Sequence, residues 1–373
     1  MKSRPAIDPL QREAGKFEYM LRKNIEWLRG GAGMLAVPCK TAVARKALRF
    51  AWERSSGVES AAIYRFGAAR HFGVSVDACA LIVRFVPDGR SKECRDYESL
   101  AGDGFPPARV FGLRDGRLAA DVPLYEKRRV FSTADAGGWR SGIKHDCSSV
   151  FELHKEGDRY VNGLGEAADL EDDLVFPLLK SSDLACCKKP HRYLLVPQRT
   201  IAENLKCLES YAPKVWTYLM THSSLIDKRA SSVYRGRPRF SIFGVGAYCF
   251  APWKVGISGF YKKLEFVKVP PFENRPVMLD DTCYFFACQS EGECDALHDI
   301  VSSTPAREYW PSLISWDSKR PITAALLNSL DLYAVARAIG RDCEAVRALA
   351  GRNCAPRRMG AQGPSLFPKE AAV

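Results

Sequence analysis

The stretch "MLAVPCKTAVARKALRFAWE", residues 34–53, joins a short apolar segment to an amphipathic one. Residues 34–40 are apolar over the length of a buried strand. The side-chain oxygen of Thr41 can cap a helix that continues to residue 54. This stretch therefore predicts a strand that leads directly into a helix, the unit from which α/β sheets are built.

The segments on either side extend this pattern. Residues 17–29 predict another helix, because apolar side chains recur there at helical spacing. These side chains are Phe17, Met20, Leu21, Ile25 and Leu28. Residues 60–66 and 74–86 are rich in apolar and β-branched side chains and predict two more strands. Together these segments predict a fragment of an α/β sheet domain.

The sequence changes character from about residue 106, where short strand candidates alternate with turns. Residues 150–166 predict a hairpin that turns at Glu-Gly-Asp, residues 156–158. Residues 200–229 are amphipathic and predict helix, which Pro213 breaks or restarts. Strand-rich sequence follows to about residue 289. Further helices are predicted around residues 291–303, 322–332 and 332–340.

Length and composition limit the class of protein. A chain of 373 residues with 46% hydrophobic side chains has room for two domains with ordinary cores. The first residues lack the apolar core of a signal peptide, and no apolar run is long enough to span a membrane. We therefore expect a cytoplasmic protein without a membrane partner. The residues after Cys354 lack periodicity, and we expect them to be disordered.

Thirteen cysteines are present, but none forms a Cys-x-x-Cys pair. Cys283, Cys288 and Cys294, with His298 nearby, are spaced more widely than the paired ligands of a zinc ribbon. We therefore expect free thiols that pack like small apolar side chains, and no metal site.

The net charge of +12 is distributed over short basic clusters. Such a surface attracts a polyanion, although a basic protein can also be merely soluble. Several of the clusters alternate with aromatic residues, a combination that suits phosphate contacts and stacking on bases. The alternative is a twisted sheet whose lysine stems cover apolar surface. The interleaved residues are Tyr234, Arg235, Arg237, Arg239, Trp253, Lys254, Tyr261, Lys262, Lys263, Trp316, Lys319 and Arg320.

Motifs for cofactor binding or catalysis are weak. "FSIFGVGAYCF", residues 240–250, contains Gly-x-Gly, but strand-like sequence with a proline follows instead of the helix that a nucleotide loop requires. "KHDC", residues 144–147, suggests a Cys/His nucleophile, although neighbouring residues seldom have the geometry for one. "LDDTC", residues 279–283, offers two carboxylates where a metal nuclease needs more. We predict no catalytic, cofactor-binding or metal-binding residue.

Four segments resemble, in the same order, the downstream half of a family of adenine-specific DNA methyltransferases of restriction-modification systems, which use S-adenosylmethionine. They are residues 142–153, 240–266, 277–286 and 315–323. Upstream, residues 25–52 and 71–83 resemble the later strands and helices of the catalytic domain of that family. The resemblance covers residues 17 to about 335.

The resemblance implies an α/β, partial Rossmann-like methyltransferase sheet, incomplete at its N-terminal side, in residues 1–105. It implies an α+β target-recognition domain in residues 106–335, followed by a helix and a disordered tail in residues 336–373. Double-stranded DNA in the bacterial cytoplasm is the implied partner. Seven residues are the expected DNA contacts: Arg239, Lys254, Tyr261, Lys262, Lys263, Lys319 and Arg320. Gly244 and Gly246 would be bends in a DNA-facing sheet.

The sequence departs from the family where catalysis is concerned. In that family the S-adenosylmethionine loop and an Asn-Pro-Pro-aromatic motif precede the segment that begins here near Phe17. The related "VPPF", residues 269–272, lacks an acceptor side chain at Val269 for the amino group of a flipped base. We therefore expect that this chain alone neither binds S-adenosylmethionine nor transfers a methyl group.

Three interpretations remain open at this stage. In the first, the chain is one half of a split enzyme and docks on a separate chain that carries the N-terminal catalytic half, or it is the remnant of a truncated gene. The exposed apolar sheet edge expected around residues 34–40 favours a partner. In the second, it is a complete methyltransferase with an unfamiliar cofactor site. In the third, it is a DNA-binding protein without enzymatic activity.

Overall fold

The computed structural model describes residues 15–101, 105–200 and 203–342, together with 346, 349 and 351. The chain divides into two compact units. The first unit comprises Met1–Val130 and Glu308–Lys319, and the second comprises Phe131–Arg307 and Arg320–Val373. The domain limits given above stay a prediction, and the tail expected to be disordered lies outside the described residues.

The first unit is built on a mixed six-stranded sheet with the order β1-β3-β2-β4-β5-β6. Strands β2 and β4 are parallel, and the other neighbours are antiparallel. The strands are β1 (Gly33–Lys40), β2 (Val58–Gly67), β3 (Asp77–Phe85), β4 (Glu93–Tyr97), β5 (Arg109–Arg114) and β6 (Arg117–Ala119). The helices are α2 (Lys16–Leu28), α3 (Thr41–Glu53), α4 (Ala68–Phe72) and α5 (Val122–Arg128), with the 3-10 helix η7 (Trp310–Ser312).

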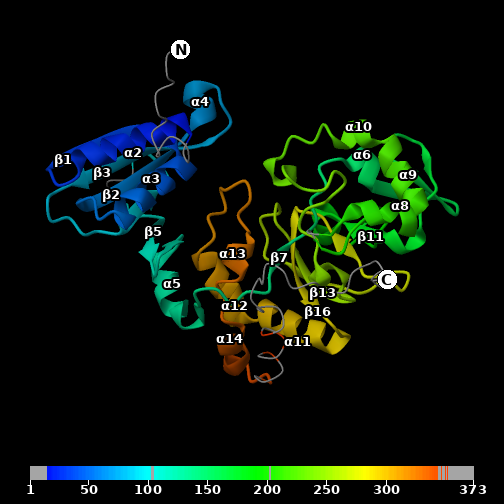
Figure 1. Cartoon of the computed structure of the whole chain (residues 1–373). Helices are drawn as coiled ribbons and strands as arrows, with labels where there is room; N and C mark the ends of the chain where they lie inside the picture. The colour runs from blue at the N-terminus through cyan, green and yellow to red at the C-terminus, as the bar shows by residue number, and fades with distance from the viewer. Residues whose placement is uncertain are drawn as a thin grey trace, which may run out of the picture. The chain divides into compact units, whose positions relative to one another are not determined.

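The strand–helix unit predicted from residues 34–53 is confirmed as β1 and α3. Helices α2 and α3 lie along strands β1, β2 and β3 (Figure 1). Their apolar faces, with Leu21 and Leu48 among the buried side chains, form one core with Ile63 and Leu81 of the sheet. The predicted cap is wrong: α3 begins at Thr41 itself, and no side chain caps it.

The second unit contains two sheets. One has the order β10-β9-β8-β12-β11-β15 and is antiparallel except for the β11–β15 pair. The other, β14-β13-β16-β7, is antiparallel throughout. The strands are β7 (Arg140–Ser141), β8 (Glu152–Glu156), β9 (Arg159–Asn162), β10 (Ala167–Ala168), β11 (Val175–Leu179), β12 (Arg192–Leu195), β13 (Trp253–Ser258), β14 (Phe266–Val269), β15 (Met278–Leu279) and β16 (Cys283–Cys288).

The helices of the second unit are mostly short. They are α6 (Ser148–Phe151), α7 (Ser181–Ala185), α8 (Leu208–Tyr211), α9 (Pro213–Thr221), α10 (Ser223–Ile226), α11 (Glu291–Ser302), α13 (Ala324–Leu327) and α14 (Leu332–Ala338), while α12 (Thr304–Tyr309) spans the division between the units. Pro213 is the first residue of α9, so the predicted restart is confirmed. The hairpin predicted in residues 150–166 is confirmed as β8 and β9.

The mixed α/β class predicted from the sequence is confirmed. One local expectation is wrong: residues 240–250 are a loop that ends in a 3-10 helix, η6 (Ala247–Phe250), and the strand begins only at Trp253. None of the helices described here has the length and apolarity needed to cross a membrane.

Candidate nucleic-acid interface

Three segments that are far apart in the sequence meet in the second unit. Ile143 forms a parallel bridge with Asp280, and Lys144 forms an antiparallel bridge with Phe243. A Cβ atom on Gly142 would lie 2.1 Å from the carbonyl oxygen of Asp280. Three of the four downstream segments that carry the resemblance thus form one backbone junction, and glycine is required where the chains approach each other.

Gly244 belongs to the same junction. Its φ of +77° is left-handed, and a Cβ there would lie 2.7 Å from the carbonyl oxygen of Gly142. Gly246 has an extended φ of −175°, which any residue adopts. The chain bends at both Gly244 and Gly246, so the predicted bends are confirmed, but they lie in a loop and not within a sheet. That these bends face DNA stays a prediction.

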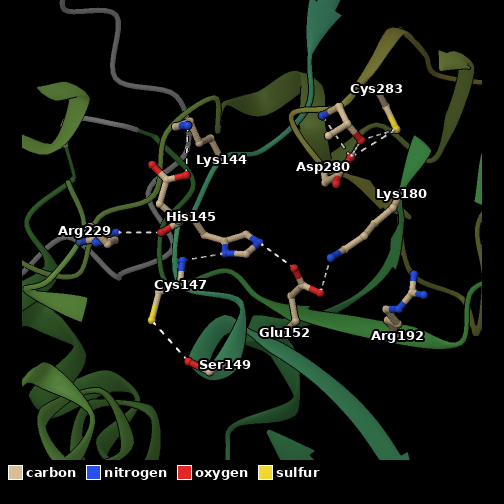
Figure 2. A network of polar contacts seen from close by, with 12 residues as sticks. Lys144, His145, Cys147, Ser149, Glu152, Lys180, Arg192, Arg229, Asp280 and Cys283 are labelled. Carbon is tan, nitrogen blue, oxygen red and sulfur yellow. Dashed lines mark hydrogen bonds and ion pairs between the residues drawn. The ribbon is translucent and has the colours of Figure 1, made fainter. Parts of the chain in front are cut away.

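A polar network that includes His145, Glu152 and Lys180 lies next to the junction (Figure 2). The Nε2 atom of His145 lies 3.2 Å from Oε1 of Glu152, and the Nζ atom of Lys180 lies 2.6 Å from Oε2 of Glu152. Burial raises the pKa of Glu152, but the hydrogen bonds from His145 and Lys180 outweigh it and lower that pKa below its ordinary value. Glu152 is therefore an ionised carboxylate that holds two donors in place.

The network does not contain a Cys/His pair. The Nδ1 atom of His145 accepts a hydrogen bond from the backbone N–H of Cys147 at 3.3 Å, and the Cys147 thiol lies 3.9 Å from the Ser149 hydroxyl (Figure 2). The imidazole thus fixes the backbone at Cys147 through Nδ1, and its Nε2 atom contacts the carboxylate of Glu152. The arrangement is that of a structural support, with the thiol directed elsewhere.

The two carboxylates of residues 280 and 281 also separate. Asp280 is buried and accepts hydrogen bonds from the backbone and hydroxyl of Thr282 and from the thiol of Cys283, and burial raises the pKa of Asp280. Asp281 instead lies 3.9 Å from the guanidinium of Arg320. Within the described part of the chain, no group of three or more His, Cys, Asp or Glu side chains is placed to hold a metal ion.

The exposed predicted contacts gather at the loop between β13 and β14, residues 259–265, called here the β13–β14 loop. Tyr261, Lys262 and Lys263 are all exposed on it. The Ser258 hydroxyl accepts hydrogen bonds from the backbone N–H groups of Phe260 and Tyr261, at 3.3 and 3.2 Å, which fix the start of the loop. The loop therefore presents an aromatic ring and two ammonium groups from a defined backbone.

Arg320 joins this loop from a distant part of the sequence. Its guanidinium carbon lies 4.5 Å from the ring centroid of Phe260, a stacking contact between a cation and an aromatic face. Sequence reasoning missed Phe260, because its partnership with Arg320 depends on the tertiary fold. Lys319, the last residue of the first unit, is exposed. A role of these residues in binding DNA stays a prediction.

Two other predicted contacts are placed differently. Arg239 is exposed, but its NH2 atom lies 2.5 Å from Oδ2 of Asp227, so a carboxylate already compensates its charge. Lys254 is only 1% exposed and donates a hydrogen bond to the carbonyl of Ala251 at 2.7 Å. A DNA contact from Lys254 conflicts with this burial, and that prediction needs correction. The burial of Lys254 could not be predicted from the sequence, because only the fold shows that both faces of β13 are covered.

Burial lowers the pKa of Lys254 from 10.5 to about 8. Between those two values the unfolded chain holds a proton that the folded chain has lost, so the free energy of unfolding rises with pH in this window. Wild type should gain about 3 kcal/mol of stability between pH 8 and 10.5, and a Lys254→Met variant should lack this gain. Urea unfolding at several pH values measures the difference. A constant difference would contradict the burial of an uncharged amine.

No family model matches this chain. The chain is 39% identical over 325 residues to the Type II methyltransferase M.NspV of Nostoc sp., and the match spans 86% of this chain and 67% of the relative. A solved structure of the Type IIL restriction-modification enzyme MmeI in complex with DNA is similar in fold, with a TM-score of 0.53 and 14% identity. That likeness covers 92% of this chain and 45% of the other.

Proposed function

This chain belongs to the Type II methyltransferase family, and on that premise we propose that it supplies the DNA-recognition part of an adenine-specific, S-adenosylmethionine-dependent methyltransferase. The observation that carries the proposal is the β13–β14 loop with Arg320 beside it. Lys262, Lys263 and Arg320 are cations that suit phosphate or base-edge contacts, and Phe260 and Tyr261 offer aromatic faces.

The way the loop is mounted supports this proposal. Ile257 pairs with Phe266 across the two strands, and Ser258 pairs with Cys283 of β16, so both ends of the loop leave a paired sheet. Side chains on such a frame lose little conformational entropy when they bind, because the backbone is already ordered. A rigid base with exposed cations suits a surface that must meet DNA in one register.

The catalytic groups are proposed to come from polypeptide outside this sequence. Transfer to an adenine amino group requires an acceptor side chain and an aromatic platform for the flipped base. In "VPPF", Val269 is a buried aliphatic residue at the end of β14 and accepts no hydrogen bond through its side chain. The described residues therefore support recognition, and the methyl donor would be bound by a separate catalytic part.

The first unit has a surface that suits such a part. Leu35 and Val37 of β1 pack on the core beneath the helices, so Met34, Ala36 and Pro38 point to the opposite face of the sheet. On that face the register places Ala36 beside Ile82, which in turn pairs with Ala62.

Exposure supports the same assignment. Met34, which points to that face, is 66% exposed. Exposed apolar surface of this kind is typical of an interaction site. The segment of M.NspV that this chain does not match, about a third of that relative, is the proposed occupant.

Fluorescence anisotropy with a labelled duplex of mixed sequence tests the recognition part. Wild type should bind with an affinity that falls linearly on a log–log plot against salt. In Lys262→Ala/Lys263→Ala the slope should fall by about 1 to 2, since each phosphate contact contributes about 0.9 and Glu265 lies 3.6 Å from the Lys263 ammonium. Lys268→Ala is the matched control. Lys268 lies on the adjoining strand β14, and its Nζ atom is bound to Asp295 at 2.8 Å. Equal losses in the two variants would count against the β13–β14 loop.

Calorimetry and methyl incorporation test the catalytic part. We expect no heat of binding when S-adenosylmethionine is titrated into the chain alone. Tritiated methyl transfer to adenine should appear when the unmatched segment of M.NspV is added as a second polypeptide. Micromolar binding by the chain alone would favour a complete methyltransferase, and label in cytosine would rule out adenine specificity.

A further inference from the structure

A second basic element lies outside the β13–β14 loop. Residues 230–241, called here the arginine loop, follow α10 and contain one 3-10 turn, η5 (Ser232–Tyr234). Arg235, Arg237 and Arg239 are exposed within five consecutive positions. The carboxylate of Asp227 neutralises Arg239. Arg235 and Arg237 have no ion-pair partner among the described residues. The loop therefore carries two uncompensated guanidinium groups.

The arginine loop is held by a residue that is itself outside it. The guanidinium of Arg229 donates hydrogen bonds to the carbonyls of Arg239 and Ser241, both at 2.7 Å, and to that of Ile226 at 3.0 Å. A longer hydrogen bond, at 3.4 Å, reaches the carbonyl of His145 (Figure 2). One side chain thus ties the C-terminal end of the loop to α10 and to the polar network.

Aromatic contacts complete the attachment. The guanidinium carbon of Arg229 lies 3.9 Å from the ring centroid of Tyr234, and the Tyr234 hydroxyl donates to the carbonyl of Lys144 at 3.1 Å. Burial lowers the pKa of Arg229, yet an arginine remains charged at neutral pH. Its charge is met by a ring and by four backbone carbonyls, two of which belong to the loop.

Arg237 has a geometry suited to a ligand. Its Nε atom donates to the carbonyl of Val233 at 2.9 Å, and its guanidinium carbon lies 5.8 Å from the ring of Phe243, which is exposed. The backbone of Phe243 exchanges two hydrogen bonds with Lys144, at 2.9 and 2.8 Å. Arg237 is therefore held beside an anchored aromatic ring.

A solvated charged surface would not require this construction. Exposed arginines that serve only solubility gain nothing from an ordered backbone, whereas like charges held close together in the free protein repel each other until a polyanion neutralises them. A guanidinium that is already held in place, as that of Arg237 is, also reaches phosphates or guanine edges at a lower entropic cost.

We propose that the arginine loop is a second DNA-binding element, in which Arg235 and Arg237 contact duplex DNA and Arg229 is the positioning residue. The inference rests on the proposed function and adds to it residues that the family resemblance does not supply.

Salt-dependent binding of the full chain to a labelled duplex of mixed sequence tests this assignment. Arg235→Ala/Arg237→Ala should reduce the slope of log affinity against log salt by about 2, as two phosphate contacts are lost. Arg239→Ala, the matched control, should change the slope by less than half as much, because Asp227 already neutralises that side chain.

Arg229→Met tests the positioning role. We expect this variant to bind DNA more weakly than wild type. The triple variant Arg229→Met/Arg235→Ala/Arg237→Ala should bind no more weakly than the Arg235→Ala/Arg237→Ala double variant, because Arg229 acts only through those two arginines. A general loss of structure would instead add to the loss of the double variant.

The outcomes separate the two claims. If wild type binds no duplex, the proposed function and this inference both fail. If wild type binds and the Arg235→Ala/Arg237→Ala variant keeps the full slope, or if Arg239→Ala loses as much, only the arginine loop is excluded. If the effect of Arg229→Met adds fully to that of the double variant, Arg229 is not the positioning residue.

Discussion

Replacing Asp317 with asparagine should destabilise the first unit by about 3 kcal/mol, since removing one member of a buried ion pair leaves the other charge uncompensated. The two guanidinium nitrogens of Arg45 lie 2.5 and 2.6 Å from the two carboxylate oxygens of Asp317. Their side chains are only 8% and 12% exposed. This fork joins the segment Glu308–Lys319 to α3, so its loss affects the segment that completes the unit.

Glu53→Gln is the matched control for this prediction. Arg49 and Glu53 form an ion pair on the same helix, but both side chains are about half exposed, and such a pair is worth at most about 0.5 kcal/mol. Hydrogen exchange followed by mass spectrometry can assign each loss to a unit. Equal protection of first-unit peptides in the Asp317→Asn variant and wild type would show that the fork contributes nothing.

The destabilisation caused by Asp317→Asn should also depend on pH. Burial raises the pKa of Asp317, but the hydrogen bonds and charge of Arg45 outweigh it and lower that pKa below 3.8. The contribution to stability is therefore present above the unfolded value and lost as pH falls through the folded one. The difference between wild type and Asp317→Asn should shrink in acid.

Gly142→Ala should cost about 3 kcal/mol in the second unit, because the added methyl collides with the backbone of two consecutive residues. The new Cβ would lie 2.1 Å from the carbonyl oxygen of Asp280 and 2.3 Å from that of Leu279. The backbone has little freedom to move away, since Gly142 N–H donates to Cys283 and Ile143 N–H donates to Leu279, at 3.1 and 2.7 Å.

Gly292→Ala provides the comparison for Gly142. Gly292 lies in α11 of the same unit, and a Cβ there meets nothing within 4 Å. The change should be neutral or stabilising by up to about 1 kcal/mol, because alanine favours helix. Thermal unfolding of both variants measures the contrast, and similar melting temperatures would mean that the junction relaxes without cost.

Much of the architecture could be predicted from local sequence. The strand and helix of residues 34–53 follow from apolar length and amphipathic spacing, and the hairpin at residues 150–166 follows from its turn. The predicted cap at Thr41 is wrong, because the helix starts one residue earlier than its composition indicates. The loop at residues 240–250 was mistaken for strand, since its apolar side chains serve the core without forming a ladder.

The candidate site was harder to predict for a similar reason. Exposure separates Lys262 from Lys254, yet both are lysines next to aromatic residues in the sequence. Only the tertiary fold shows that Asp227 neutralises Arg239, while no carboxylate in the described part of the chain pairs with Arg235 or Arg237. Pairings between distant segments decide which cations are available, and a pattern of residue types does not contain them.

The mounting of the β13–β14 loop has an evolutionary consequence. Because the strands on both sides are fixed by their own pairing, substitutions at Tyr261, Lys262 or Lys263 change the exposed surface without disturbing a buried neighbour. Mutations there carry little risk of misfolding, so selection can explore them freely. If the β13–β14 loop reads DNA as proposed, a restriction-modification system built on this chain would acquire a new target sequence through a few point mutations while its scaffold stays unchanged.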